Sequence, residues 1–268
     1  MIDLRRKSLT RILLLLLALG LVACQPQDAV AIVEEVLAPP SAQTPFTPRA
    51  RPTDSARRPS SVTASLSPTP GKRVKNTPGD FDFFVLALSW SPDYCANNAN
   101  DAQQCSLGKK LAFVLHGLWP QYTRGYPADC SIVKLPKDAQ QKFPNLSPSS
   151  KLYTHEWDKH GTCSGLKPLE FLARSKSLKE SIVIPTAYRS PAKAFRTTID
   201  DLKTAFVAAN STLGEDALAA QCSGSGRFLK ELYVCFSREG KPIACSKELQ
   251  QDEAKSCGRA DFLVRNVK

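Results

Sequence analysis

Histidine is the side chain best suited to proton transfer near neutral pH, and this chain of 268 residues has only three. His116 lies in the segment FVLHGLWP, and His155 and His160 lie about forty residues later in HEWDKHGTC. Any chemistry that needs imidazole must therefore come from these two segments.

His116 lies in an apolar run over residues 110–119 that predicts a buried strand. Strand alternation places its side chain on the same face as Val114 and Leu118. By itself, a histidine in that setting is more often a core residue with satisfied hydrogen bonds than a catalyst.

The second segment concentrates reactive side chains in a run that we expect to be helical over about residues 152–161. With His155 as zero and about 100° per residue, Lys159 falls at about 40° and Glu156 at about 100° around the helix. His160 falls at about 140°, so the four side chains share one side. A solvated charged face is the usual interpretation of such a run, but it does not explain why two of the three histidines are there.

Other catalytic sites fit the sequence poorly. The zincin motif needs histidines four residues apart, whereas His155 and His160 are five apart. The sequence has no CxxC pair, no P-loop and no G-x-S-x-G elbow. We therefore expect no metal and no other cofactor.

Cleavage of RNA through its own 2′-hydroxyl suits this set of residues. The reaction needs a base to remove the hydroxyl proton and an acid to protonate the departing 5′-oxygen, and histidine can serve as either. The phosphorane gains negative charge, which a cation and hydrogen-bond donors stabilise best where water is excluded. The substrate supplies its own nucleophile.

The rest of the chain divides into three parts. Residues 1–24 have a basic start and an apolar run, ILLLLLALGLVA, which is the layout of an export signal. Residues 25–78 are rich in Pro, Ala, Ser and Thr with almost no aromatic residue, so we expect a disordered tether. Residues 79–268, the predicted catalytic domain, hold 25 basic and 20 acidic residues, a net charge of +5 that is compatible with a polyanionic substrate.

The export signal ends in LVAC, which resembles the lipobox of bacterial lipoproteins, where the cysteine is lipidated and becomes the first mature residue. Lipidation of Cys24 predicts an exported protein tethered in the cell envelope, on the periplasmic face of the outer membrane because Gln25 follows. An ordinary cleaved signal, giving a soluble periplasmic or secreted protein, is the alternative. A retained membrane anchor is a third, for which the apolar run is short.

Without Cys24 the chain has eight cysteines, and an even number in an exported protein indicates disulfides. Eight cysteines allow 105 pairings, so spacing alone does not select one.

Apolar patterns predict strands at residues 80–92, 110–119, 228–236, 241–245 and 261–265, and helices at about residues 152–161, 168–182 and 195–209. Because strands and helices do not alternate regularly, we expect an α+β fold with a mainly antiparallel central sheet flanked by helices.

FVLHGLWP and HEWDKHGTC resemble the two active-site segments of the ribonuclease T2 family. The similarity extends to WSPDYC upstream and to LYVCF, IAC and SCG downstream, over roughly residues 80–265. It implies a bacterial, exported, metal-independent endoribonuclease with the family's α+β fold. Such an enzyme cleaves single-stranded RNA to a 2′,3′-cyclic phosphate and then slowly hydrolyses this to a 3′-phosphate.

The resemblance also implies roles for the reactive residues. His160 matches the family's general base and His116 its general acid. Glu156 and Lys159 match residues that stabilise the charged transition state, and His155 matches the residue that holds the phosphate.

Trp119 and Tyr126 match positions where the family stacks a base, which suits aromatic faces. Some members have an acidic residue that helps to read the base where this chain has Gln121. The resemblance therefore does not imply a base preference.

The family pattern implies the disulfides Cys130–Cys163, Cys222–Cys257 and Cys235–Cys245, which leaves Cys95–Cys105. The first would fasten the end of the catalytic helix to the loop after Trp119.

Two other classes of function deserve comparison. A non-catalytic RNA-binding lipoprotein would not need both His116 and His160, and a structural envelope lipoprotein has no reason for HEWDKHGTC. The expected partners are RNA and, through Cys24, a membrane. No obligate protein partner is evident from the sequence.

Overall fold

Residues 76–268 are described by a computed structural model. The predicted signal peptide with Cys24, and residues 25–75 of the predicted tether, lie outside the described residues. None of the helices within residues 76–268 combines the length and apolar character that a membrane span requires.

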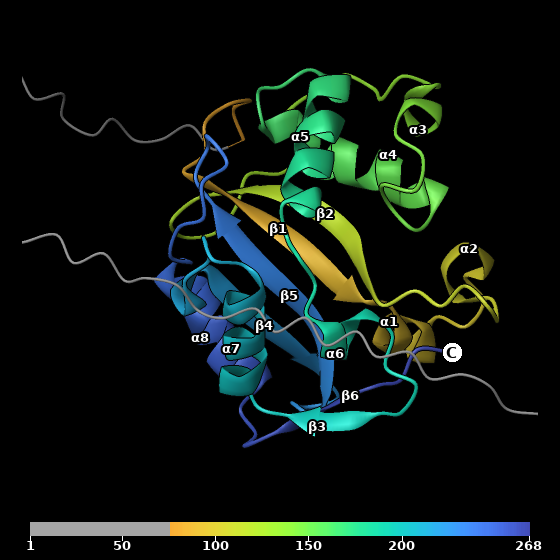
Figure 1. Ribbon diagram of the computed structural model, residues 1–268. Coiled ribbons are helices and arrows are strands. Elements are labelled where there is room, and N and C mark those ends of the chain that lie inside the picture. The colour runs from red at the N-terminus through yellow and green to blue at the C-terminus, as the bar shows by residue number, and fades with distance from the viewer. Residues whose placement is uncertain (1–75) are drawn as a thin grey trace, which may run out of the picture. The chain divides into compact units, whose positions relative to one another are not determined.

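A six-stranded sheet forms the centre of this part of the chain, in the order β2-β1-β5-β6-β3 with β4 also paired to β5 (Figure 1). The strands are β1 (Phe83–Trp90), β2 (Phe113–Gln121), β3 (Phe195–Thr197), β4 (Leu218–Ser223), β5 (Phe228–Phe236) and β6 (Phe262–Val264). All paired strands are antiparallel except β5 and β6, which are parallel. The predicted α+β class with a mainly antiparallel sheet is confirmed.

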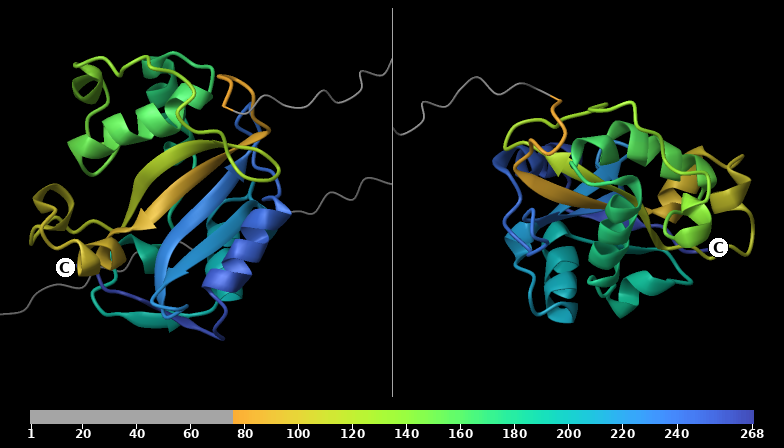
Figure 2. Two further views of the ribbon diagram at one scale, coloured as in Figure 1. Left: turned by 180° about the vertical axis from the view of Figure 1, so that it is seen from behind. Right: turned by 90° about the horizontal axis from the view of Figure 1, so that it is seen from above.

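Helices cover both faces of the sheet. They are α1 (Ser91–Asn97), α2 (Ala102–Cys105), α3 (Ala139–Lys142), α4 (Ser150–Lys159), α5 (Pro168–Glu180), α6 (Thr186–Arg189), α7 (Ile199–Ala209) and α8 (Lys247–Ser256), with short 3-10 helices at η1 (Gly161–Cys163) and η2 (Glu215–Ala217). α5 and α7 lie over one face in Figure 1, and the view from behind in Figure 2 shows α8 on the other.

The two faces of the sheet bury separate apolar clusters. The larger cluster joins Leu86 and Leu118 of the sheet to Trp157 of α4, Phe171 of α5 and Phe206 of α7. The smaller one lies under α8 and includes Phe83, Val85 and Cys235, with Trp119, Tyr233 and Leu249 packed against it. α4 contacts β2, the strand at the end of the sheet order. A helix at this edge can send one side chain into the larger core and others toward the opposite face.

β2 contains a β-bulge at His116. Ala87 of β1 pairs with Gly117 and Leu88 pairs with Leu115, so His116 is the extra residue without a partner across the ladder. A bulge resets the alternation of side chains. The prediction that His116 shares a face with Leu118 is therefore wrong: Leu118 lies in the larger core, whereas His116 lies on the face of Trp119.

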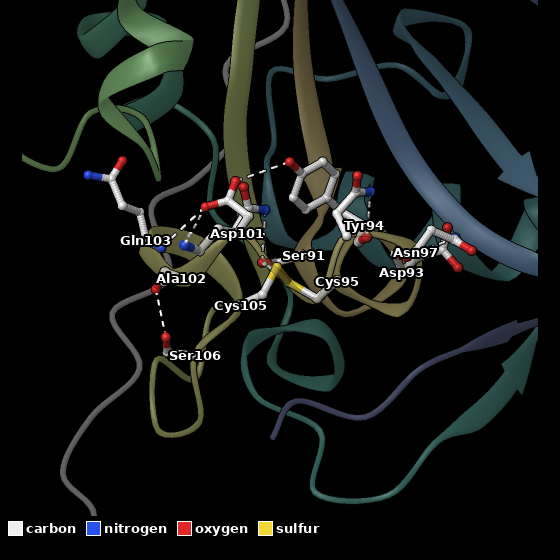
Figure 3. The surroundings of a disulfide bond; sticks show 12 residues. Ser91, Asp93, Tyr94, Cys95, Asn97, Asp101, Ala102, Gln103, Cys105 and Ser106 are labelled. Carbon is white, nitrogen blue, oxygen red and sulfur yellow. Dashed lines mark hydrogen bonds between the residues drawn. A yellow bond between two sulfur atoms is a disulfide. The ribbon is translucent and has the colours of Figure 1, made fainter.

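The described part of the chain contains four disulfides, and they are the four pairs that the family resemblance implies: Cys95–Cys105, Cys130–Cys163, Cys222–Cys257 and Cys235–Cys245. Cys95–Cys105 joins α1 to α2 beside the capping hydrogen bonds of Asp101 (Figure 3). Each short helix has few core contacts of its own, so the bridge and the cap hold the pair together.

Most of the predicted long elements are present, and two differ from the prediction. Residues 195–209 divide into β3 and α7, because the side chain of Thr198 caps α7 by accepting a hydrogen bond from the backbone of Asp201. Residues 241–245 form no strand; only Pro242 makes an isolated bridge, and proline lacks the N–H that a ladder needs. β4 and α8 were not predicted.

Candidate active site

A cleft of 420 Å³ opens on the face of the sheet that carries the smaller core. All seven side chains predicted from the sequence to act on RNA line it: His116, Trp119, Tyr126, His155, Glu156, Lys159 and His160. They come from β2, from the loop after it and from α4 with the residue that follows it. The rest of the wall comes from β4, β5 and α8, through residues that include Gln221, Tyr233, Glu248 and Asp252.

α4 and the residue that caps its C-terminus, His160, bring four of these residues together, as the helical spacing predicts. Its opposite side is anchored in the core, where Trp157 is 2% exposed and donates a hydrogen bond from Nε1 to the carbonyl oxygen of Val133 at 2.7 Å. The end of the helix is tied to the loop after β2 by the Cys130–Cys163 disulfide. In the same place, the backbone N–H of Asp129 donates to the carbonyl of Lys159 at 2.9 Å.

His116 contacts a carboxylate with each ring nitrogen. Nδ1 lies 2.6 Å from Oε1 of Glu231, and Nε2 lies 3.5 Å from Oε1 of Glu156. Burial alone would lower the pKa of His116, but the hydrogen bond to Glu231 and the negative charges of both carboxylates raise it above its usual value. His116 is therefore biased toward the protonated state.

Glu156 is buried at the point where α4 approaches β2. Its Oε2 accepts a hydrogen bond from Nε1 of Trp119 at 2.6 Å. Its Oε1 is buried and has no hydrogen-bond partner among the described residues. Burial raises the pKa of Glu156, although His116 and the hydrogen bond from Trp119 oppose the rise.

The approach of α4 to β2 depends on Gly117. A Cβ atom at this position would lie 1.9 Å from Oε2 of Glu156 and 2.4 Å from Nε1 of Trp119. Only a residue without a side chain leaves room for the carboxylate and the indole there.

His160 follows α4 and is 6% exposed. Its ring lies against that of Trp119, with centroids 5.2 Å apart, and its Nδ1 has no hydrogen-bond partner among the described residues. Burial, together with the positive charges of Lys159 and the other two histidines, lowers the pKa of His160 to about 3. His160 and His116 are thus biased toward opposite protonation states within one cleft.

The remaining predicted residues form the open side of the cleft. The side chain of His155 is 58% exposed, with Nε2 4.0 Å from Oε1 of Glu156. The Nζ atom of Lys159 lies 6.0 Å from the ring centre of Tyr126, which is 52% exposed. A polyanion entering from solvent would meet these side chains first.

Glu231 is the main residue of the site that the sequence analysis missed. A charged residue inside the apolar strand segment FLKELYVCF is the signal that could have identified it, because a charge buried in a strand needs partners. Gln121, by contrast, lines the cleft as its position after the Trp-Pro pair suggests. Within residues 76–268, no group of three or more His, Cys, Asp or Glu side chains is arranged to hold a metal ion.

A second cavity of 220 Å³ borders the same histidine. It is lined by His116 and Glu231 together with residues of α1 and of the start of α4, among them Asp93 and Leu152. His116 therefore lines both the 420 Å³ cleft and this 220 Å³ cavity.

Comparisons with known proteins show which family the chain belongs to. Residues 81–245 match the sequence profile of the Ribonuclease T2 family. The chain is 40% identical to a ribonuclease of Aeromonas hydrophila over 73% of its length and 91% of that protein. It is 24% identical to a probable ribonuclease of Haemophilus influenzae, over 65% of this chain and 64% of the other. It is 23% identical to ribonuclease I of Escherichia coli, over 68% and 85% of the two chains.

Solved structures show the same fold. A ribonuclease MC1 variant in complex with 5′-UMP superposes with a TM-score of 0.55 at 21% identity, over 71% of this chain and 99% of the other. A ribonuclease-related protein from Calystegia sepium gives a TM-score of 0.51 at 20% identity, over 70% and 97% of the two chains. With the profile match and the Aeromonas relative, this places the chain in the ribonuclease T2 family.

Proposed function

We propose that the chain is an endoribonuclease that cleaves single-stranded RNA through the 2′-hydroxyl without a metal ion. The observation that carries the proposal is the opposite bias of two histidines in one cleft, His160 toward the neutral form and His116 toward the protonated form. A neutral imidazole can accept a proton and a protonated one can donate it, so both are ready before substrate arrives.

In the first step, His160 removes the proton of the 2′-hydroxyl, and the 2′-oxygen attacks the adjacent phosphorus. The bond from phosphorus to the 5′-oxygen breaks, and His116 gives its proton to the departing oxygen. The product is a 2′,3′-cyclic phosphate. In the second step water attacks, with His116 now accepting a proton and His160 returning one, to leave a 3′-phosphate.

The neighbouring residues would stabilise the charge that develops on phosphorus. Lys159 supplies a cation at the mouth of the cleft, and His155 beside it would hold the phosphate in the ground state. Burial raises the pKa of Glu156, so its carboxylate takes up a proton more readily than an exposed one as negative charge develops on the phosphoryl oxygens. Its Oε1, which accepts no hydrogen bond from the described residues, lies 3.5 Å from Nε2 of His116, where the reacting phosphate would lie.

The cleft and the second cavity, which both border His116, would bind the nucleosides that flank the scissile phosphate. In the larger one, Trp119 and Tyr126 offer aromatic faces on which a base can stack. Gln121 presents an amide rather than a carboxylate to that base, so discrimination by an acidic side chain at this position is absent.

The test is to incubate the purified protein with single-stranded RNA in excess EDTA and to identify the product ends. We expect undiminished cleavage, with 2′,3′-cyclic phosphates that convert slowly to 3′-phosphates. Loss of activity in EDTA that zinc or magnesium restores would refute the proposal.

We further propose that the protein is exported and is held on a membrane by a lipid on Cys24. The LVAC sequence after an apolar run and the four disulfides, which need an oxidising compartment, support this placement. Two or three acyl chains suffice for stable attachment, whereas one is marginal.

Cell fractionation of the wild type and of Cys24→Ser tests the lipid anchor. The wild type should enter the detergent phase and incorporate labelled palmitate, and Cys24→Ser should do neither. A wild-type protein found only in the soluble periplasmic fraction would show that the signal is an ordinary one.

A further inference from the structure

Behind His116, on the side away from Glu156, lies a carboxylate with no role in the proposed reaction. Glu231 lies in the middle of β5 and pairs across the sheet with Ser89 of β1. Leu232 and Val234 of the same strand lie in the larger core. The side chain of Glu231 is only 4% exposed.

Hydrogen bonds from three side chains hold this carboxylate in place. Oε1 accepts from the hydroxyl of Ser89 at 2.6 Å and lies 2.6 Å from Nδ1 of His116. Oε2 accepts from the hydroxyl of Tyr233 at 3.0 Å, with Nζ of Lys230 at 3.7 Å. A carboxylate buried without partners would be protonated, and these contacts keep it charged.

We propose that Glu231 is a positioning residue for the acid His116: by accepting a hydrogen bond from Nδ1, it fixes the ring so that Nε2 and its proton face the reacting phosphate. The inference rests on the proposed function, since it assigns a role relative to that reaction. Glu231 itself touches no reacting atom.

Two physical effects follow from the contact. Nδ1 is occupied by Glu231, so the proton that can be transferred must be on Nε2, the nitrogen nearer to Glu156 and the cleft. The fixed negative charge also favours the imidazolium form: burial opposes the charge of Glu231, but hydrogen bonds from His116 and Ser89 bring its pKa down to about 2. At neutral pH Glu231 is therefore an anion.

The other charged groups around His116 both raise and lower its pKa. Glu156 on α4 adds a second negative charge, whereas Lys230 on β5 and His160 at the end of α4 carry or can acquire positive charge. Asp93 of α1 borders the same cavity as His116 but is paired with Arg265 at 3.0 Å. Among residues 76–268, only Glu231 is hydrogen-bonded to the imidazole of His116.

The test is the pH dependence of kcat and kcat/KM for the full-length Glu231→Gln variant on a dinucleoside phosphate. Glutamine keeps the shape of the side chain and removes its charge. We expect kcat at pH 7 to fall about tenfold or more with KM within threefold of the wild type. The alkaline limb of the pH profiles of kcat and kcat/KM should shift by about one pH unit to lower pH.

Glu253→Gln is the matched control, because Glu253 is also a buried carboxylate, paired with Lys203 and with the backbone N–H of Ala220 outside the cleft. Its pH profile should superimpose on that of the wild type. A Glu231→Gln profile that also superimposes, in a variant that melts as a folded protein, would overturn the proposal.

A measurement on the wild type decides the matter even if Glu231→Gln fails to fold. With three histidines in the chain, ring ¹⁵N shifts can be assigned by single substitutions and followed against pH. We expect His116 to titrate above the usual 6.5, with proton occupancy at Nδ1 retained. Titration at or below 6.5 would overturn the positioning role. A wild type that cleaves no RNA would instead refute the proposed function.

Discussion

Replacing Gly117 by alanine tests how closely catalysis depends on the approach of α4 to β2. The added methyl carbon would lie 1.9 Å from Oε2 of Glu156, whereas ordinary van der Waals contact begins at 3.4 Å. The carboxylate must therefore retreat by about 1.5 Å. Given the 2.4 Å between the same methyl carbon and Nε1 of Trp119, a retreat directly away from the methyl stretches the 2.6 Å hydrogen bond from Trp119 to about 3.6 Å, beyond bonding distance.

The expected loss follows from this displacement. Misplacing a catalytic group by about 1 Å can cost ~10²-fold in rate, so kcat of Gly117→Ala should fall by about two orders of magnitude. Forcing a methyl group into a packed contact costs about 1–3 kcal/mol of stability, which leaves the enzyme folded in the assay. Steady-state kinetics on a dinucleoside phosphate and thermal unfolding measure the two effects.

Gly214→Ala is the matched control. Its methyl carbon would also meet a carboxylate oxygen, Oδ1 of Asp216 at 2.4 Å, but Asp216 is exposed and lies outside the cleft. Its carboxylate can swing into solvent, so both kcat and stability should stay near the wild type.

A double variant separates displacement of Glu156 from general damage. If Gly117→Ala acts through this carboxylate, Glu156→Gln should cost much less in the Gly117→Ala background than in the wild type, because the two changes remove one interaction. A folded Gly117→Ala enzyme with kcat within threefold of the wild type would refute the reasoning.

Three further predictions concern the histidines and one disulfide. His116→Ala and His160→Ala should each lower kcat by about 10²–10⁴-fold, since each removes a proton-transfer group. His155→Ala should mainly raise KM. A His116→Ala rate within tenfold of the wild type would exclude the role of His116 as the acid. The base His160 must be neutral, so activity is lost as pH falls through its lowered pKa. The acid His116 must be protonated, so activity is lost as pH rises through its raised pKa. The plateau of kcat/KM should thus extend well below pH 6.5, and an acid limb centred at or above 6.5 would contradict the assignment. Replacing Cys130 and Cys163 together by serine should lower the free energy of unfolding by about 4 kcal/mol, because the bridge spans 33 positions. Denaturant titration measures this loss, which would be smaller if the segment between the two cysteines were already ordered without the disulfide.

The sequence predicts the arrangement of the candidate catalytic residues on α4 well because helical geometry is local. The spacing of His155, Glu156, Lys159 and His160 sets their common side before any tertiary contact is known, and all four line the cleft. β5 was predicted with its observed bounds for a similar reason, since its apolar run is long and ends at turn residues.

Features that depend on distant contacts could not be read in this way. Glu231 becomes recognisable as a partner of His116 only when β5 is placed beside β1. The polar helix α8 has only Glu253 buried, so it lacks the apolar stripe by which helices are identified. β4 is short and, within the described sheet, pairs with β5 alone, so little in its own residues marks it as a strand.

The bulge in β2 behaves like a change of phase in a periodic pattern. Before it, the side chains on the cleft side have even numbers, as in His116; after it they have odd numbers, as in Trp119. Two residues three positions apart can share a face of a strand only if such a change lies between them. The odd spacing of three residues between His116 and Trp119 in FVLHGLW therefore indicates the β-bulge in the sequence itself. A chain with the same two residues an even number apart would need no bulge, and deletion of one residue between them would restore the regular ladder while keeping both on the cleft side.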